Sequence, residues 1–216
     1  MKNKTVLYIV GGVMILLLFL IGAYKLTNTG SPSSYGDITT VKANDHVKWS
    51  PDKKNVLVEY SDFQCPACKA YHDILKPFEA SSSPDFKITQ KVAFIYRFFP
   101  LYQVHQNAYA ASYAAEAAGK QRKFFELGDL LFDTQDQWKN LGNPSDFFVK
   151  LAEQLKLDTE KFKSDMNASD VKKRVDDDLA SGNNAGVNST PTFFLNGKKL
   201  DTIRSFDEFK KLLSSL

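Results

Sequence analysis

The sequence predicts an α/β fold in which one sheet is divided along the chain by a helical insertion. Two β-branched apolar runs, Asn55–Ser61 and Val92–Phe99, precede a long segment whose apolar residues recur at helical spacing, and a hairpin pattern at Thr192–Leu200 follows that segment. The chain has 216 residues, of which 43% are hydrophobic, so it is long enough to bury one sizeable core. We expect one main domain with appendages.

The first part of the domain is predicted as a βαβ unit. The segment from Pro66 to Phe78 lies between the two apolar runs and has a helical pattern. A kink or stop is expected at Pro77, because proline lacks the backbone N–H that a helix interior uses. A strand, a helix and a strand in this order favour a parallel pair of strands joined by a right-handed crossover.

The segment from Gln103 to Ala180 is predicted as a helical subdomain. Five helices are indicated by an alanine-rich run, by apolar residues three or four positions apart, and by residues that cap helix ends. The residues that carry these patterns are Gly119, then Phe124, Leu127 and Leu131, then Asn143 and Pro144, then Asp158, and finally Val171, Val175 and Leu179.

The last part of the chain returns to strands. Thr192–Leu195 and Lys198–Leu200 flank the dipeptide Asn196-Gly197, which favours a type I′ hairpin turn because both residues accept positive φ. An amphipathic helix from Ser205 to Leu216, with Ser205 as its N-cap, closes the chain.

The N-terminus is predicted to anchor the chain in a membrane. Thr5–Tyr24 carries no charge and, as a helix, would span about 30 Å, the thickness of a bilayer core. The run is longer than that of a cleaved signal peptide and lacks a clear cleavage motif, so we expect an uncleaved single-pass anchor, with cleavage after the helix as the alternative. Lys2 and Lys4 before the span, against Lys25 alone just after it, favour a cytoplasmic N-terminus and an extracytoplasmic catalytic domain at the cell membrane.

A stretch rich in Thr, Gly, Ser, Pro and Asn follows the anchor and is typical of a flexible tether. The predicted organisation is a membrane anchor over 1–25, a linker over 26–44, and a globular domain over 45–216 whose helical insertion covers about 103–180 and whose sheet-forming parts cover about 45–102 and 181–216. The net charge is only +3, and lysines are interspersed with acidic residues, so the basic stripe of a nucleic-acid-binding protein is missing.

The two cysteines of the sequence stand at a spacing that favours redox chemistry. Cys65 follows a strand and a short turn, and Pro66 occupies the first helical position, so Cys65 falls at a helix N-terminus. Backbone N–H groups and the helix dipole stabilise a thiolate there. Cys68 lies almost one turn later and can attack a mixed disulfide formed at Cys65. We therefore expect an exposed, nucleophilic Cys65 and a resolving Cys68.

Two other interpretations of the cysteines are weaker but stay open. A structural bridge between Cys65 and Cys68 would close a very short loop and would restrict the unfolded chain little. A zinc site needs four ligands, and the sequence has no third cysteine, so it would have to recruit carboxylates or two of His46, His72 and His105.

Several motifs occur together in an order that is more specific than a lone CxxC. They are Phe63-x-Cys65-Pro66-x-Cys68 after a strand ending in Glu59-Tyr60, Phe99-Pro100-Leu101 with His105, an alanine-rich run over 110–119, and Gly186-Val187-x-x-Thr190-Pro191-Thr192-Phe193-Phe194. In this combination the sequence from about Asp45 to Leu216 resembles the DsbA-like thioredoxin-fold oxidoreductases, and within them the membrane-anchored bacterial branch similar to BdbD. The resemblance implies a thioredoxin fold with an inserted helical subdomain, preceded by one N-terminal transmembrane helix.

The resemblance also implies a substrate-binding surface beside the cysteines. Pro191 looks like the cis-proline that faces the active disulfide, although most X-Pro bonds are trans. Its neighbour Thr190 would pair through its backbone with a bound substrate strand, and Pro66 and Phe63 would contact substrate as well.

Glu59 stands six residues before Cys65, in the place of the buried acid of thioredoxin-like proteins. Because its strand is expected to be covered on both faces, we predict a raised pKa suited to proton transfer with Cys68. A solvated glutamate at a strand end is the alternative. We interpret His72 as a helix-surface histidine and assign no chemistry to His105.

These predictions converge on an extracytoplasmic thiol:disulfide oxidase that donates the Cys65–Cys68 disulfide to unfolded exported proteins with free thiols. A low pKa of Cys65 stabilises the reduced form and so makes the disulfide form a strong oxidant. The resemblance implies reoxidation by a membrane quinone-linked partner, either DsbB-like or of the vitamin K epoxide reductase type. No bound cofactor or metal is expected. The alternatives are a reductase or isomerase of exported disulfides and a chaperone-like binding module for unfolded chains.

Overall fold

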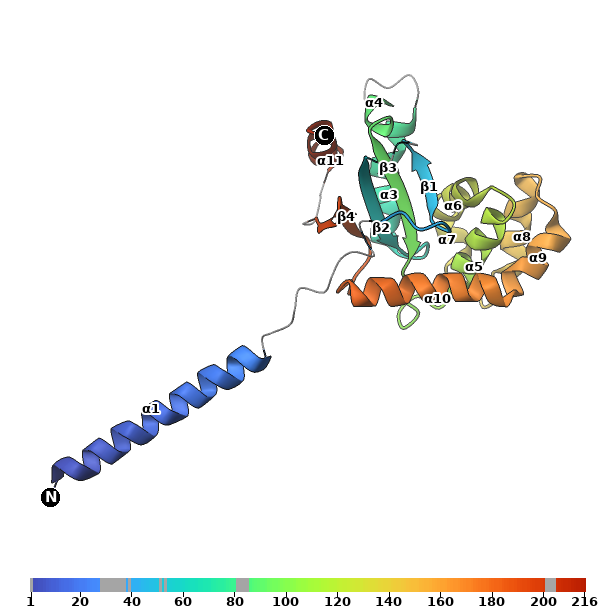
Figure 1. The fold of residues 1–216 in the computed structure, drawn as a ribbon. Coiled ribbons are helices and arrows are strands. Elements are labelled where there is room, and N and C mark those ends of the chain that lie inside the picture. The colour runs from blue at the N-terminus through green and yellow to red at the C-terminus, as the bar shows by residue number, and fades with distance from the viewer. Residues whose placement is uncertain are drawn as a thin grey trace. The chain divides into compact units, whose positions relative to one another are not determined.

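The protein is described by a computed structural model that covers residues 2–27, 38, 40–50, 52, 54–80, 86–200 and 205–216. Contacts between residues divide the chain into two compact units, Met1–Ser34 and Tyr35–Leu216. The second unit holds the sheet and the other helices (Figure 1). Both cysteines belong to this unit.

The first unit contains one helix, α1, which covers Lys2–Thr27 and includes the predicted span Thr5–Tyr24. Its described apolar side chains are exposed, for example Ile15 at 70% and Phe19 at 71%. Among the residues that the structure describes, no helix is long and apolar enough to cross a membrane. The membrane anchor therefore stays a prediction.

The second unit is built on a five-stranded mixed sheet with the order β1-β3-β2-β4-β5. The central strands β2 (Asn55–Ser61) and β3 (Val92–Phe98) are parallel, which confirms the predicted pair. Strand β4 (Thr192–Leu195) pairs antiparallel with β2 and continues through Asn196-Gly197 into β5 (Lys198–Lys199). The sequence did not indicate β1 (His46–Trp49), because four residues are too few to show a strand pattern.

Helices cover the sheet and form the insertion. Helix α3 (Pro66–Glu79) and the short α4 (Phe86–Thr89) connect β2 to β3, and α3 continues two residues beyond Pro77 rather than stopping there. The insertion consists of α5 (Ala108–Gly119), α6 (Phe124–Asp133), α7 (Gln135–Trp138), α8 (Ser145–Gln154), α9 (Thr159–Asn167) and most of α10 (Ser169–Asn184), and α11 (Phe206–Ser214) closes the chain. The predicted helical insertion is thereby confirmed.

Two of the predicted N-caps are present. Oδ1 of Asp158 accepts a hydrogen bond from the backbone N–H of Lys161, and Oγ of Ser205 accepts one from that of Glu208. The predicted cap at Asn143 is wrong by one position, since α8 begins at Ser145 and Pro144 is its N-cap. The side chain of Asn143 instead accepts the backbone N–H of Ser145, two residues on.

The sheet separates two apolar clusters. On one face, residues of β2 and β3 pack with α3, the insertion and α11. On the other face, Tyr60 and Phe99 pack with the chain that leaves α10. Helix α10 approaches this face so closely that a Cβ at Gly182 would lie 2.6 Å from the ring of Phe99, so glycine is required at that position.

Two described residues of the predicted linker make contacts within the second unit. Ile38, which the sequence analysis assigns to the linker 26–44, is 2% exposed and belongs to the second apolar cluster. The carbonyl of Thr40 also accepts a hydrogen bond from Arg97 of β3. A single isoleucine among polar residues gives no periodic signal, so the sequence does not indicate this packing. Residues 28–37 and 39 of the predicted linker lie outside the described residues.

Candidate active site

The two cysteines lie where β2 ends and α3 begins. Cys65 is the N-cap of α3, and its backbone N–H donates to the carbonyl of Asp62 at 3.0 Å. Both cysteines are free thiols. Cys65 is 6% exposed and Cys68 0%, so Cys65 is less exposed than predicted, although its neighbours Pro66 and Ala67 are exposed. The first turn of α3 therefore reaches the surface beside the Cys65 thiol.

The loop before β4 completes this surface. The peptide bond between Thr190 and Pro191 is cis, in line with the expectation from the resemblance. The Cys65 thiol donates to the carbonyl of Thr190 at 3.5 Å, so the two segments meet although they are far apart in sequence. Of the predicted substrate contacts, Pro66 is exposed and Thr190 is 8% exposed, and their contact with substrate stays a prediction.

Phe63 does not fit its predicted substrate contact. It is 1% exposed, and its ring stacks on Tyr96 with a centroid distance of 4.8 Å and packs against Phe132 at 5.0 Å. The turn after β2 directs this side chain into the aromatic core between the sheet and α6, so a bound substrate strand cannot reach it.

The pKa values of the two thiols are shifted in opposite directions. A hydrogen bond with the Cys68 thiol lowers the pKa of Cys65 to about 6, against the opposing effect of burial, with smaller contributions from Thr190 and from backbone N–H groups of Ala67 and Cys68. The backbone N–H groups at the helix end, which the sequence suggested as the cause, thus lower the pKa of Cys65 less than the Cys68 thiol does. Burial raises the pKa of Cys68 well above its ordinary value, and the nearby Cys65 adds to that effect. At neutral pH, Cys65 is therefore the thiolate and Cys68 the thiol.

Two substitutions at Cys68 test this assignment. Cys68→Ala removes the hydrogen bond and should raise the pKa of Cys65, whereas Cys68→Ser keeps a donor and should leave that pKa near 6. The pH dependence of Cys65 alkylation by iodoacetamide measures both values. Equal midpoints in the two variants would mean that the Cys68 thiol does not stabilise the Cys65 thiolate.

Asp62 organises the turn before the cysteines. It is fully buried, and its Oδ2 accepts the backbone N–H of Leu101 at 2.9 Å and contacts Nδ1 of His105 at 2.7 Å. Its Oδ1 accepts the backbone N–H of Gln64 at 2.8 Å. The hydrogen bond to Asp62 raises the pKa of His105. Sequence reasoning missed Asp62, because only the fold brings the loop after β3 next to the turn after β2.

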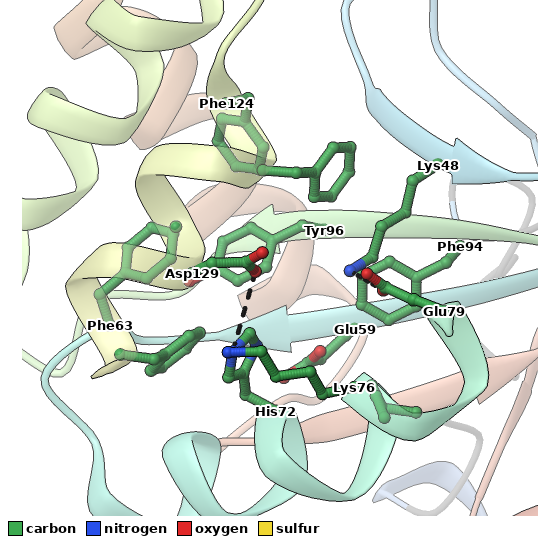
Figure 2. Close-up of a pocket in the computed structure, with 14 residues that line it drawn as sticks. Lys48, Glu59, Phe63, His72, Lys76, Glu79, Phe94, Tyr96, Phe124 and Asp129 are labelled. Atoms are coloured by element: carbon green, nitrogen blue, oxygen red, sulfur yellow. Dashed lines mark ion pairs between the residues drawn. The ribbon is translucent and has the colours of Figure 1, made fainter. Parts of the chain in front are cut away.

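Glu59 lies in the core between the sheet and α3. It is 4% exposed, and burial raises its pKa to about 7, while Ser61 and Lys48 act in the opposite direction. The buried position predicted for Glu59 is therefore present, and the solvated alternative is not. Glu59 borders a cavity of about 30 Å³ that is also lined by Lys48, His72, Tyr96 and Asp129 (Figure 2).

Glu59 should make stability depend on pH. Its folded pKa of about 7 exceeds the ordinary value of 4.5, so the folded state holds a proton that the unfolded state has already lost between these pH values. Wild-type stability should then fall as pH rises through this window, by up to about 3 kcal/mol. Glu59→Gln does not titrate and should become the more stable protein above pH 7. Urea unfolding of both reduced proteins across the window measures the difference, and a constant difference would contradict the raised pKa.

The three histidines do not form a zinc site with the cysteines. Each one contacts a different carboxylate: His46 contacts Glu116 at 2.6 Å, His72 contacts Asp129 at 3.8 Å, and His105 contacts Asp62. His72 is not the surface residue that the sequence suggested, since its side chain is 11% exposed and burial lowers its pKa to about 4.

One group of possible metal ligands occurs within the described part of the chain. It consists of His72, Asp73 and Asp133. Lys69 and Lys76 already pair with the two aspartates, each at 3.0 Å, so their charges are compensated without a cation.

Comparison with known proteins agrees with this geometry. The model of the family described as Thioredoxin matches residues 42–215. Among solved structures, alpha-DsbA1 of Wolbachia pipientis superposes with a TM-score of 0.71 at 20% identity, covering 85% of this chain and 96% of that one. Oxidised BdbD from Bacillus subtilis superposes with a TM-score of 0.67 at 20% identity, covering 79% and 91%. These two likenesses show the fold.

A curated relative is much longer than this chain. The Na(+)/H(+) antiporter NhaA 1 of Mycobacterium sp. (strain KMS) is 35% identical over 184 residues, which make up 82% of this chain but only 28% of the antiporter. The chain thus spans about a quarter of the length of this relative. The match covers too little of the antiporter to carry that protein's activity over to this chain.

Proposed function

We propose that this chain, which belongs to the thioredoxin family, is a protein thiol:disulfide oxidoreductase that uses Cys65 and Cys68. The observation that carries the proposal is that the pKa of Cys65 is lowered while the pKa of buried Cys68 is raised. Dithiol exchange needs these two properties. One sulfur must attack or leave as a thiolate, and the other must stay protonated until it resolves the mixed disulfide. The likeness in fold to DsbA and BdbD structures supports the same activity.

The exchange follows from the geometry. With the Cys65–Cys68 bond formed, a substrate thiolate attacks the Cys65 sulfur, and Cys68 leaves with the electrons of the broken bond. A second substrate thiolate then attacks the substrate sulfur of this mixed disulfide, and Cys65 leaves as a thiolate. The substrate is oxidised to a disulfide, and the protein is reduced to its dithiol form.

The favoured direction is oxidation of the substrate. A thiolate that is stable at Cys65 stabilises the reduced protein, and a stable reduced form makes the disulfide form a better oxidant. Thr190 and Pro191 would align an extended segment of an unfolded chain beside Cys65, through backbone hydrogen bonds that tolerate many sequences.

The predicted location and partners belong to this proposal. Thr5–Tyr24 would anchor the protein in the cell membrane, with the N-terminus in the cytoplasm and the domain outside, where exported proteins acquire disulfides. Reoxidation would then fall to a membrane quinone-linked partner, DsbB-like or of the vitamin K epoxide reductase type. The uncharged run Thr5–Tyr24 in the sequence supports this proposal.

A pair of assays tests the direction. In the first, the oxidised protein is mixed with reduced, unfolded ribonuclease A, and disulfide formation is followed by thiol trapping. In the second, the reduced protein is mixed with insulin, and reduction of the insulin disulfides is followed by turbidity. We expect rapid oxidation of ribonuclease A and slow reduction of insulin. The reverse pattern would favour the reductase, and binding of unfolded chains without exchange would favour the chaperone-like module.

A further inference from the structure

Three buried polar atoms around Glu59 have no hydrogen-bond partner. Within the described part of the chain, Oγ of Ser61, the hydroxyl of Tyr96 and Nε2 of His72 are buried and unpartnered. An unpaired buried polar group costs free energy, so each one needs either a water molecule or a functional explanation. All three residues lie on elements that surround Glu59.

Strand β2 brings Ser61 next to both Glu59 and Cys68. Glu59 and Ser61 are two residues apart, so their side chains project from the same face of the strand. Directly after Ser61, the backbone N–H of Asp62 donates to Sγ of Cys68 at 3.5 Å. The end of β2 therefore holds the Cys68 thiol beside the Ser61 hydroxyl. The Glu59 carboxyl lies two residues earlier on the same face of the strand.

The Ser61 hydroxyl influences the titration of three buried neighbours. It acts to lower the pKa values of Glu59, Cys68 and Tyr96, all of which burial raises. In this structure Oγ of Ser61 has no hydrogen-bond partner of ordinary geometry. A hydroxyl can accept one proton while it donates its own, which allows it to pass a proton between two groups.

The cavity beside Glu59 supplies contact with water. Its volume of about 30 Å³ suffices for about two water molecules, and the unpartnered atoms of Tyr96 and His72 provide polar contacts for them. Figure 2 shows Asp129 of α6 facing His72 of α3 across this space, and the Asp129 side chain is 37% exposed. The other charged groups that line the cavity are Lys48, Lys76 and Glu79.

We propose that Ser61 relays a proton between Cys68 and Glu59, and that water in the cavity exchanges the proton of Glu59 with solvent. The relay rests on the thiol–disulfide exchange proposed above. When Cys68 leaves as a thiolate, protonated Glu59 gives its proton to Oγ of Ser61, whose own proton passes to Cys68. When Cys68 attacks a mixed disulfide, its proton passes to Ser61, the Ser61 proton passes to Glu59, and the departing sulfur leaves as a thiolate.

Rapid-quench kinetics of the full-length chain in detergent can separate the two thiols. The reduced protein is mixed with oxidised glutathione, acid stops the reaction, and mass spectrometry follows the glutathione adduct. The rise of the adduct reports attack by Cys65, and its decay reports attack by Cys68. Ser61→Ala should leave the rise unchanged and slow the decay about 10-fold or more, because general acid–base assistance typically contributes at least that much. It should also remove the dependence of the decay on the titration of Glu59.

A shape-matched pair controls for packing. Ser61→Thr keeps a hydroxyl and Ser61→Val does not, while the two side chains have the same shape. Decay should stay near the wild-type rate in Ser61→Thr and should be slow in Ser61→Val. Wild-type decay in Ser61→Ala would overturn the relay, as would equally slow decay in the Thr and Val variants. If wild type formed no adduct at all, the proposed oxidoreductase function would fail instead.

Discussion

Cys65→Ser should abolish thiol–disulfide exchange. A serine hydroxyl does not form the anion that a thiol with a pKa of about 6 forms at neutral pH. Cys68 cannot replace it, because Cys68 is 0% exposed and burial raises its pKa well above the ordinary value. We expect turnover with reduced ribonuclease A to fall to the uncatalysed background.

Cys68→Ser is the matched control for this loss. It keeps the Cys65 thiolate and should form a mixed disulfide with glutathione that no second thiol resolves, so the adduct should accumulate and be visible by mass spectrometry. Exchange that survived in Cys65→Ser would show that Cys65 is not the attacking thiol.

Asp45→Asn should destabilise the domain by about 3–5 kcal/mol, because it leaves a buried guanidinium without its counter-charge. The Asp45 carboxylate is fully buried and accepts from Nε and Nη2 of Arg97 at 3.1 and 2.9 Å, and Nη2 of Arg174 lies 3.6 Å from it. Arg174 in turn pairs with Asp178, whose other oxygen accepts the backbone N–H of Phe98. These ion pairs join Asp45, which directly precedes β1, to β3 and α10.

Asp177→Asn provides the comparison. Asp177 pairs with Lys173 on the exposed face of α10, and both side chains are at least half exposed, so its loss should change the free energy of unfolding by no more than about 1 kcal/mol. Urea unfolding of the three proteins measures both effects. Similar stability of Asp45→Asn and wild type would mean that the buried ion pairs do not hold the segment before β1 to the sheet.

The sequence predicts the local parts of this fold well, because their signals are local. The β-branched run at Asn55–Ser61 and the dipeptide Asn196-Gly197 specify their conformations within a few residues, and φ is positive at both turn residues. The cysteine pair and its place at the start of α3 follow from the same kind of reasoning. The buried position of Glu59 follows from the central place of its strand.

Features that depend on contacts between distant segments escape such reasoning. The contact of Asp62 with His105 and the buried pairs of Asp45 look like ordinary surface charges in the sequence, because their partners are 43 or more residues away. Phe63 was misplaced for a related reason, since the turn after β2 ends the strand alternation that would indicate where its side chain points. The cavity beside Glu59 is formed by five elements and has no counterpart in any short motif.

The redox equilibrium of Cys65 and Cys68 tests the central proposal most directly. The full-length chain is equilibrated with defined ratios of reduced and oxidised glutathione, trapped with an alkylating reagent and analysed by mass spectrometry. We predict that both thiols oxidise together in one reversible two-electron transition, with a midpoint near or above about −180 mV, as an oxidase requires. A reversible midpoint near about −270 mV would assign the protein to the reductases, and the absence of reversible exchange would contradict the oxidoreductase function itself.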